Sequence, residues 1–143
     1  VQEQADRTFS YLAAYWPAGD RVVQLTDSTM RTALLLPGDR WALGTDGRAD
    51  ERRGTIEGLP RADHYAVDPR TGARRRVLEG LRQGPVLPGP DGRHVLVYDA
   101  GDFHQVDLAT GTRRNLTAGA PVAFWDTEDD HNVVKPPTAP IGW

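Results

Sequence analysis

The chain has 143 residues, the size of a single domain, and its 38% hydrophobic and 26% charged residues are typical of a soluble globular protein. Its net charge of −3 gives no basic footprint for nucleic acid, and no apolar stretch approaches the roughly 18–20 residues that cross a bilayer. The absence of cysteine excludes disulfides, thiolate metal sites and cysteine nucleophiles. We therefore expect neither a nucleic-acid partner nor a membrane span.

The first element that the sequence predicts is a β-hairpin in residues 11–26. Two apolar segments flank a turn that contains Pro17 and Gly19, and the second segment ends in Leu25-Thr26. The same Leu-Thr pair recurs at 116–117, after a stronger hairpin. We expect residues 1–26 to form the outer hairpin of a partial four-stranded unit.

Two different hairpins follow in residues 27–79. The first joins the apolar strands of segment 34–43 through a Pro-Gly-Asp-Arg turn. The second lies in segment 63–72 and turns at Asp68-x-x-Thr-Gly, where the aspartate side chain can accept backbone N–H groups and Gly72 can supply a positive φ. The pattern predicts one four-stranded unit in which residues 46–62 are an insertion.

The same two hairpins recur in the same order in residues 80–117. Segment 102–111 matches segment 63–72 at an offset of 39, whereas Arg93 matches Arg40 at an offset of 53, which places an insertion of 14 residues in the earlier unit. The arginines that begin the last strand of each unit, 74–76 and 113–114, occupy one repeat position. A structural role in an exposed outer strand explains them more simply than an anionic partner does.

Residues 118–143 are predicted to be a linker and the start of another unit. The linker carries the densest acidic group of the sequence, formed by Asp126, Glu128, Asp129 and Asp130, with His131 next. Oxygen ligands at this spacing could bind calcium, but the sixth position from Asp126 is His131 and not the glycine of an EF-hand. A solvated linker, or one that forms salt bridges to arginine, is the simpler interpretation.

Four-stranded antiparallel units that repeat at about 40–50 residues are typical of β-propeller blades. The sequence therefore predicts an all-β fold, an incomplete propeller of about two full blades plus partial blades; a β-sandwich remains the alternative. In such blades the insertion 46–62 and the linker leave the sheets at the same end. We expect them to form a rim where Trp125, Asp126 and His131 contact a partner domain or the substrate entrance.

The strand, Pro-Asp-Gly-Arg turn, strand and Asp-x-x-Thr-Gly hairpin ending in Leu-Thr resemble blades of prolyl-oligopeptidase-like serine peptidases and TolB-like proteins. Segments 115–119, 122–131 (with Phe-Trp-Asp and the acidic group) and 140–143 (Pro-Ile-Gly-Trp) look like a linker between blades in the dipeptidyl-peptidase branch of those enzymes. The resemblance extends from about Tyr11 onward. It implies a parent enzyme with a separate α/β-hydrolase domain that carries Ser, Asp and His, and relatives of this type are often exported to the periplasm or outside the bacterial cell.

A nucleophile elbow needs Gly-x-Ser-x-Gly, and neither serine of the chain, Ser10 or Ser28, has the flanking glycines. We therefore assign no catalytic residue and no cofactor to these 143 residues. The leading hypothesis is a non-catalytic propeller segment that gates peptide access to the hydrolase domain of the same parent chain. The alternative is a TolB-like interaction module that binds a protein or glycan and has no peptidase attached; the sequence after residue 143 separates the two.

Overall fold

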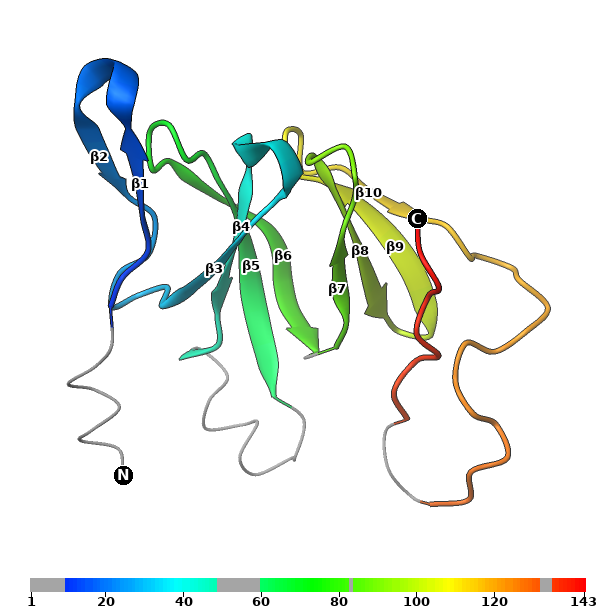
Figure 1. Cartoon of the computed structure of the whole chain (residues 1–143). Coiled ribbons are helices and arrows are strands. Elements are labelled where there is room, and N and C mark those ends of the chain that lie inside the picture. Colours follow the sequence, from blue (N-terminus) through cyan, green and yellow to red (C-terminus); the bar gives the residue numbers. More distant parts are fainter. Residues whose placement is uncertain (1–9, 49–59, 83, 132–134) are drawn as a thin grey trace.

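The computed structural model describes residues 10–48, 60–82, 84–131 and 135–143, and it consists of three antiparallel sheets that stand side by side in sequence order (Figure 1). Sheet I contains β1 (Ala13–Trp16) and β2 (Arg21–Gln24). Sheet II contains β3 (Thr32–Leu35), β4 (Ala42–Asp46), β5 (Arg61–Val67) and β6 (Arg74–Arg82). Sheet III contains β7 (Val86–Pro88), β8 (His94–Asp99), β9 (Asp102–Asp107) and β10 (Arg113–Asn115).

The helical content of the described ranges is small. The 3₁₀ turns η1 (Pro17–Gly19) and η2 (Pro37–Asp39) connect β1 to β2 and β3 to β4. No helix in these ranges is long and apolar enough to cross a membrane. The expected all-β, antiparallel class and the four-stranded units are therefore confirmed.

Sheets II and III have the same up-and-down order, and β6 and β10 lie at their edges as expected. Asp46 pairs with Asp63 in sheet II, and Asp99 pairs with Asp102 in sheet III. The β4–β5 connection is therefore longer than the β8–β9 connection by the 14 residues that the two offsets predict. Most of this insertion, residues 49–59, lies outside the described residues.

One predicted boundary differs from the structure. Strand β6 continues past residue 79, where we expected the unit to end, because Ala62 and Arg61 pair with Leu81 and Arg82. The register between β5 and β6 shifts on both sides of His64. These irregularities let β6 carry more residues than the β5 strand that it pairs with.

The turns that close the outer hairpins have the predicted construction. The Oδ1 atom of Asp68 accepts the N–H of Arg70, and Oδ1 of Asp107 accepts the N–H of Ala109, each at 2.8 Å. The N–H groups of Gly72 and Gly111 donate to the carbonyls of the same aspartates. Both glycines have φ values near the left-handed region, at 75° and 79°, which favours glycine at this position.

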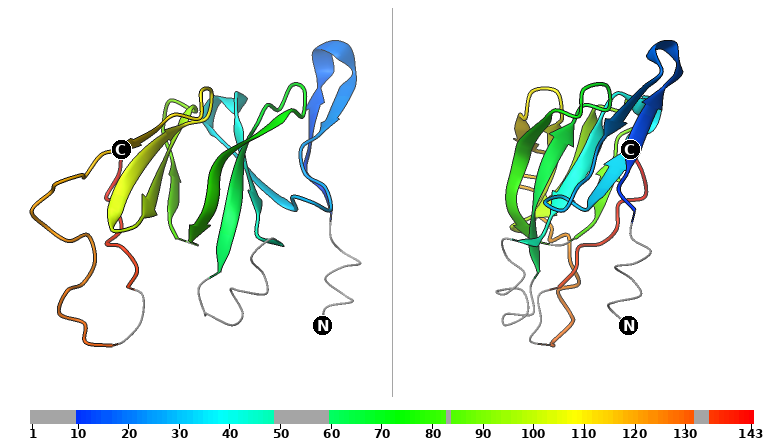
Figure 2. Two further views of the ribbon diagram at one scale, coloured as in Figure 1. Left: turned by 180° about the vertical axis from the view of Figure 1, so that it is seen from behind. Right: turned by 90° about the vertical axis from the view of Figure 1, so that its left-hand side faces the viewer.

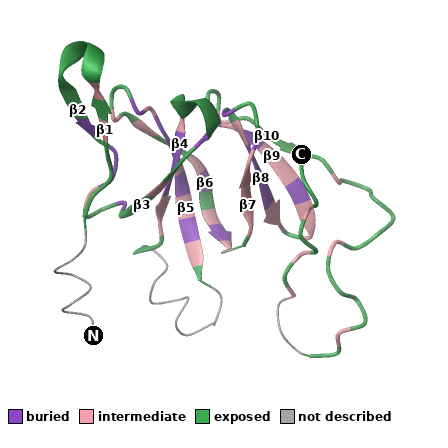
Figure 3. Ribbon diagram, in the orientation of Figure 1, coloured by how far each residue is buried: buried purple, intermediate pink, exposed green. Residues whose placement is uncertain are grey.

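The hydrophobic core lies between the sheets, so that each sheet is covered by its neighbour (Figures 2 and 3). Because side chains alternate along a strand, neighbouring residues of β4 and β5 enter different cores. Ala42 and Val67 face sheet I, whereas Leu43 and Ala66 face sheet III. We call the two contacts junction I–II and junction II–III. Junction I–II buries Val23, Leu25, Met30, Ala42 and Val67; junction II–III buries Leu36, Leu43, Ala66, Leu78, Leu81, Val95, Val97, Val106 and Leu108.

Candidate functional site

The linker after β10 is anchored to sheet III by an aromatic contact, and backbone contacts join its two ends to each other. The ring of Phe124 meets Phe103 edge-on, with centroids 5.5 Å apart, and Phe103 in turn packs against Tyr98. The carbonyl of Phe124 accepts the N–H of Thr138 at 2.6 Å, and Trp125 forms a β-bridge with Pro137. These contacts bring two separated parts of the C-terminal segment together beside the last sheet.

Trp125 is the sequence-predicted rim residue that packs best. Its ring lies beside Gly101 in the β8–β9 turn, where an added Cβ atom would come within 3.4 Å of the indole. The side chain nevertheless keeps 37% of its surface exposed. Trp125 can therefore contact a partner while its position stays fixed by sheet III.

Asp126 and Glu128 do not join the metal-ligand group that the sequence suggested. The Oδ1 atom of Asp126 accepts the backbone N–H of Glu128 at 2.9 Å, which closes a local turn, and both residues are exposed. The Asp126 carboxylate thus stabilises the linker backbone. No described acidic or histidine ligand lies close enough to complete a site with either residue.

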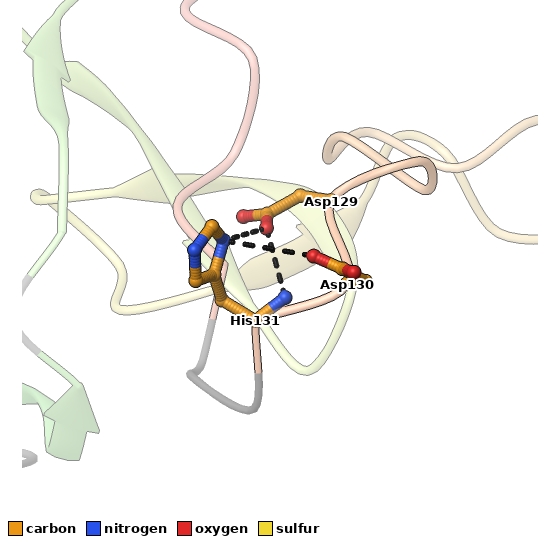
Figure 4. Close-up of side chains that lie close together, drawn as sticks. All are labelled: Asp129, Asp130 and His131. Atoms are coloured by element: carbon orange, nitrogen blue, oxygen red, sulfur yellow. Dashed lines mark hydrogen bonds and ion pairs between the residues drawn. The ribbon is translucent and has the colours of Figure 1, made fainter.

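Asp129, Asp130 and His131 do come together (Figure 4). One ligand atom from each lies within 4.8 Å of the others. Nδ1 of His131 is 2.6 Å from Oδ1 of Asp129 and 4.0 Å from Oδ1 of Asp130. The backbone N–H and the imidazole of His131 lower the pKa of Asp129 by hydrogen bonding to its carboxylate.

The chemistry of this acidic turn is limited by its exposure. The side chains of His131 and Asp130 are 79% and 99% exposed, and Nδ1 of His131 is hydrogen-bonded to Asp129. Water competes for all these groups, so a cation would gain little by replacing its hydration shell. The geometry fits a solvated acidic turn better than it fits a metal centre.

The predicted rim is described only in part. Strand β4 ends and β5 begins at the end of the sheets toward which the linker descends (Figure 1). The linker, with Trp125, Asp126 and His131, therefore lies at the end of the sheets where the rim is predicted. The half that residues 49–59 would supply lies outside the described residues, so the complete rim stays a prediction.

Neither serine lies in a nucleophile elbow. Ser28 belongs to the turn that joins sheets I and II, in which Asp27 accepts hydrogen bonds from the backbone N–H groups of Thr29 and Met30. Hydrogen bonds from the Thr29 hydroxyl and these backbone groups lower the pKa of Asp27 to about 2. Asp27 is therefore a turn-forming carboxylate, and Ser10 is exposed just before sheet I.

A basic groove at junction I–II was missed by the sequence reasoning. Arg21, Arg70 and Arg74 border a volume of about 700 Å³ between β2 and the β5–β6 turn. The arginines that begin β6 were expected to have a structural role in an exposed outer strand, and Arg74 and Arg75 each donate hydrogen bonds to carbonyls of a neighbouring segment. The sequence repeat did contain one indication of this groove. Val23 occupies the strand position at which the other two units have an arginine.

Comparison of the sequence with protein-family models finds no match, and comparison with curated proteins also finds none.

Proposed function

We propose that the chain is a non-catalytic part of a β-propeller that gates peptide access to a separate α/β-hydrolase domain, in a serine peptidase of the prolyl-oligopeptidase type. The observation that carries the proposal is the repetition of sheets II and III. They share strand order, turn construction and face-to-face packing. Radially repeated four-stranded sheets are the building principle of propellers.

The turns of the inner hairpins support the same arrangement. Gly92, in the β7–β8 turn, lies directly against the η2 turn of sheet II, and a Cβ atom there would be 1.8 Å from the carbonyl oxygen of Pro37. Inner turns from successive sheets therefore stack on each other while the outer turns are joined by Arg75. In an up-and-down sheet these inner and outer turns lie at the same end, so the two sheets contact each other at both turns of that end, as successive blades would (Figure 1).

A gating role fits the position of the linker. Trp125 is held against sheet III yet exposed, and the acidic turn 126–131 extends beyond it (Figure 1). In the proposed parent enzyme these groups would stand at the end of the propeller that meets the hydrolase domain. A rigid aromatic side chain there would restrict the size of peptides that enter.

The first test is fluorophosphonate labelling of the complete parent protein, followed by mass spectrometry to locate the labelled serine. We expect label on a serine of a Gly-x-Ser-x-Gly turn outside residues 1–143. These 143 residues alone should not hydrolyse a proline-type chromogenic peptide. A parent protein that takes up no label and contains further blades only would refute the peptidase and leave the TolB-like interaction module as the function.

The second test measures gating in the parent enzyme without the label, because the label would inactivate it. Trp125→Ala should raise kcat/KM for long peptides relative to a dipeptide substrate, because it enlarges the entrance. Val122→Ala is the matched control, since Val122 lies on the same linker and is 62% exposed. Equal effects of Trp125→Ala on long and short substrates would contradict gating at this position.

A further inference from the structure

The groove at junction I–II runs between two edge strands. All four residues of β2, Arg21 to Gln24, border it on one side. Arg70, Thr71 and Gly72 of the β5–β6 turn border it on the other, with Arg74 at the start of β6. Consecutive residues of a strand can line a groove together only if the strand presents its backbone edge. The groove therefore offers main-chain groups as well as side chains.

The equivalent space at junction II–III is filled by the protein itself. Arg75 of β6 reaches across to the β9–β10 turn and donates to the carbonyls of Leu108 and Thr110, at 2.8 and 2.5 Å. Its guanidinium lies directly on Gly111, where a Cβ atom would be 2.8 Å away. The chain thus covers this turn with its own side chain.

Junction I–II has a shorter side chain at that position. Val23 lies against Gly72 as Arg75 lies against Gly111, with its Cγ1 3.2 Å from where a Cβ atom would be. The carbonyl of Pro69 is satisfied by Nε1 of Trp16 at 2.9 Å. Val23 is too short to reach the other carbonyls of the turn as Arg75 does, and the groove lies beside this turn.

Three arginines and one carboxylate, Asp27, border the groove, so its charges are unbalanced. Arg74 is paired with Asp27 at 2.9 Å and also donates to the carbonyl of Leu25. Within the described ranges, Arg21 and Arg70 have no carboxylate partner; the guanidinium of Arg70 lies 6.0 Å from the ring centroid of Trp16, which orients it. Two guanidinium groups are therefore available for an anionic ligand.

The edge of β2 has a free position between them. Leu25 donates its N–H to Leu12, and residues alternate between paired and outward-facing groups in an antiparallel ladder. The N–H and C=O of Val22 therefore point away from β1. Val22 is also 67% exposed.

We propose that this groove binds an extended acidic peptide segment of a partner protein. Carboxylates of the segment pair with Arg21 and Arg70, and its backbone pairs with the free edge at Val22. Strand addition to an exposed edge, with side-chain selection by flanking groups, is a recurring mode of peptide recognition. The inference is independent of the proposed function, because it concerns edge strands and not the rim.

The test is fluorescence anisotropy with a labelled, acetylated peptide in which valine alternates with glutamate. We expect saturable binding that weakens as the salt concentration rises, because the contacts are ionic. Arg21→Ala and Arg70→Ala should each weaken binding about tenfold. Arg114→Ala is the matched control, an exposed arginine of edge strand β10 that does not border the groove.

Two further probes make the result decisive. A peptide in which valine alternates with glutamine should not bind, and inorganic phosphate at the same concentration should not displace the acidic peptide. Displacement by phosphate would show a general anion site and overturn the peptide proposal. Equal loss of affinity in Arg114→Ala would overturn the assignment to the groove. Circular dichroism of each variant verifies that its fold is intact.

Discussion

The two junctions pack an outer strand against a turn in the same way, but they use different side chains as hydrogen-bond donors. In both, the outer strand of one sheet faces a turn of the next sheet that contains a positive-φ glycine, Gly72 or Gly111. At junction II–III the turn carbonyls receive a guanidinium from Arg75, whereas at junction I–II the indole of Trp16 donates to Pro69. The repeated backbone therefore fixes which carbonyls need a donor and leaves the choice of donor open.

This difference has an energetic consequence. Of the described residues, nine apolar side chains are buried at junction II–III and five at junction I–II. Buried apolar area is the main favourable term in folding. We therefore expect junction II–III to hold the two complete sheets together and junction I–II to open first. The groove lies at the weaker contact, where a bound ligand would add to the stability.

The largest effect is expected from Leu108→Ala. Leu108 is fully buried at junction II–III, and its removal leaves a cavity between sheets II and III. Such truncations cost about 2–5 kcal/mol. The free energy of unfolding in urea measures the loss. Leu116→Ala, in the same unit but at a side chain 46% exposed, should cost well under half as much; equal losses would show that the sheets do not depend on this core.

Arg75→Ala is expected to have the next largest effect. It leaves the carbonyls of Leu108 and Thr110 without their charged donor, and a loss of about 1–2 kcal/mol is expected for such partly exposed hydrogen bonds. Arg114→Ala, at the same repeat position of β10, should be close to neutral in the same denaturation experiment. If the two variants lose equal stability, Arg75 does not act as a bridge between sheets.

The features that the sequence predicted correctly are local. The outer turns depend on an aspartate and a glycine four residues apart, and the insertion of 14 residues follows from two offsets. The turns depend on neighbouring residues and the insertion on a comparison of repeated segments, so the sequence pattern alone could find both. The edge position of β6 and β10 also followed from their basic, exposed character.

The features that escaped prediction depend on the approach of separate sheets. No local pattern shows that Arg75 meets the β9–β10 turn or that Trp16 meets Pro69, because these pairs are brought together by packing. The acidic group of the linker was also only partly predictable from the spacing of its residues. Asp126 was grouped with Asp129 by spacing, but its hydrogen bond to Glu128 commits it to a separate turn.

Trp16→Phe measures the donor used at junction I–II. Phenylalanine keeps most of the ring but removes the bond from Nε1 to Pro69, and we expect a loss of about 0.5–1.5 kcal/mol. The loss should be smaller than that of Arg75→Ala, since one neutral bond is removed and not two charged ones. A larger loss for Trp16→Phe than for Arg75→Ala would show that the donor at junction I–II contributes more to stability than the donor at junction II–III.

His64→Phe tests how junction II–III responds to acid. His64 is 6% exposed on the face of β5 that Ala66 shares, and its Nδ1 has no partner among the described residues. Burial lowers its pKa, with smaller opposing effects from the Ala62 backbone and the Asp63 charge. The unfolded chain therefore binds a proton more readily than the folded chain does, and stability should fall as the pH drops below about 6.5.

Phenylalanine should remove this acid sensitivity at little cost at neutral pH. The equivalent position of sheet III holds Phe103, which shows that the repeat accommodates a phenyl ring there. Urea denaturation between pH 7 and 5 is the measurement. Asp27 and Asp91, whose pKa values are about 2, lose their contributions only below pH 4, so they do not overlap this range. Unchanged acid sensitivity in His64→Phe would show that another group titrates. The stability of junction II–III would then not depend on the charge state of His64.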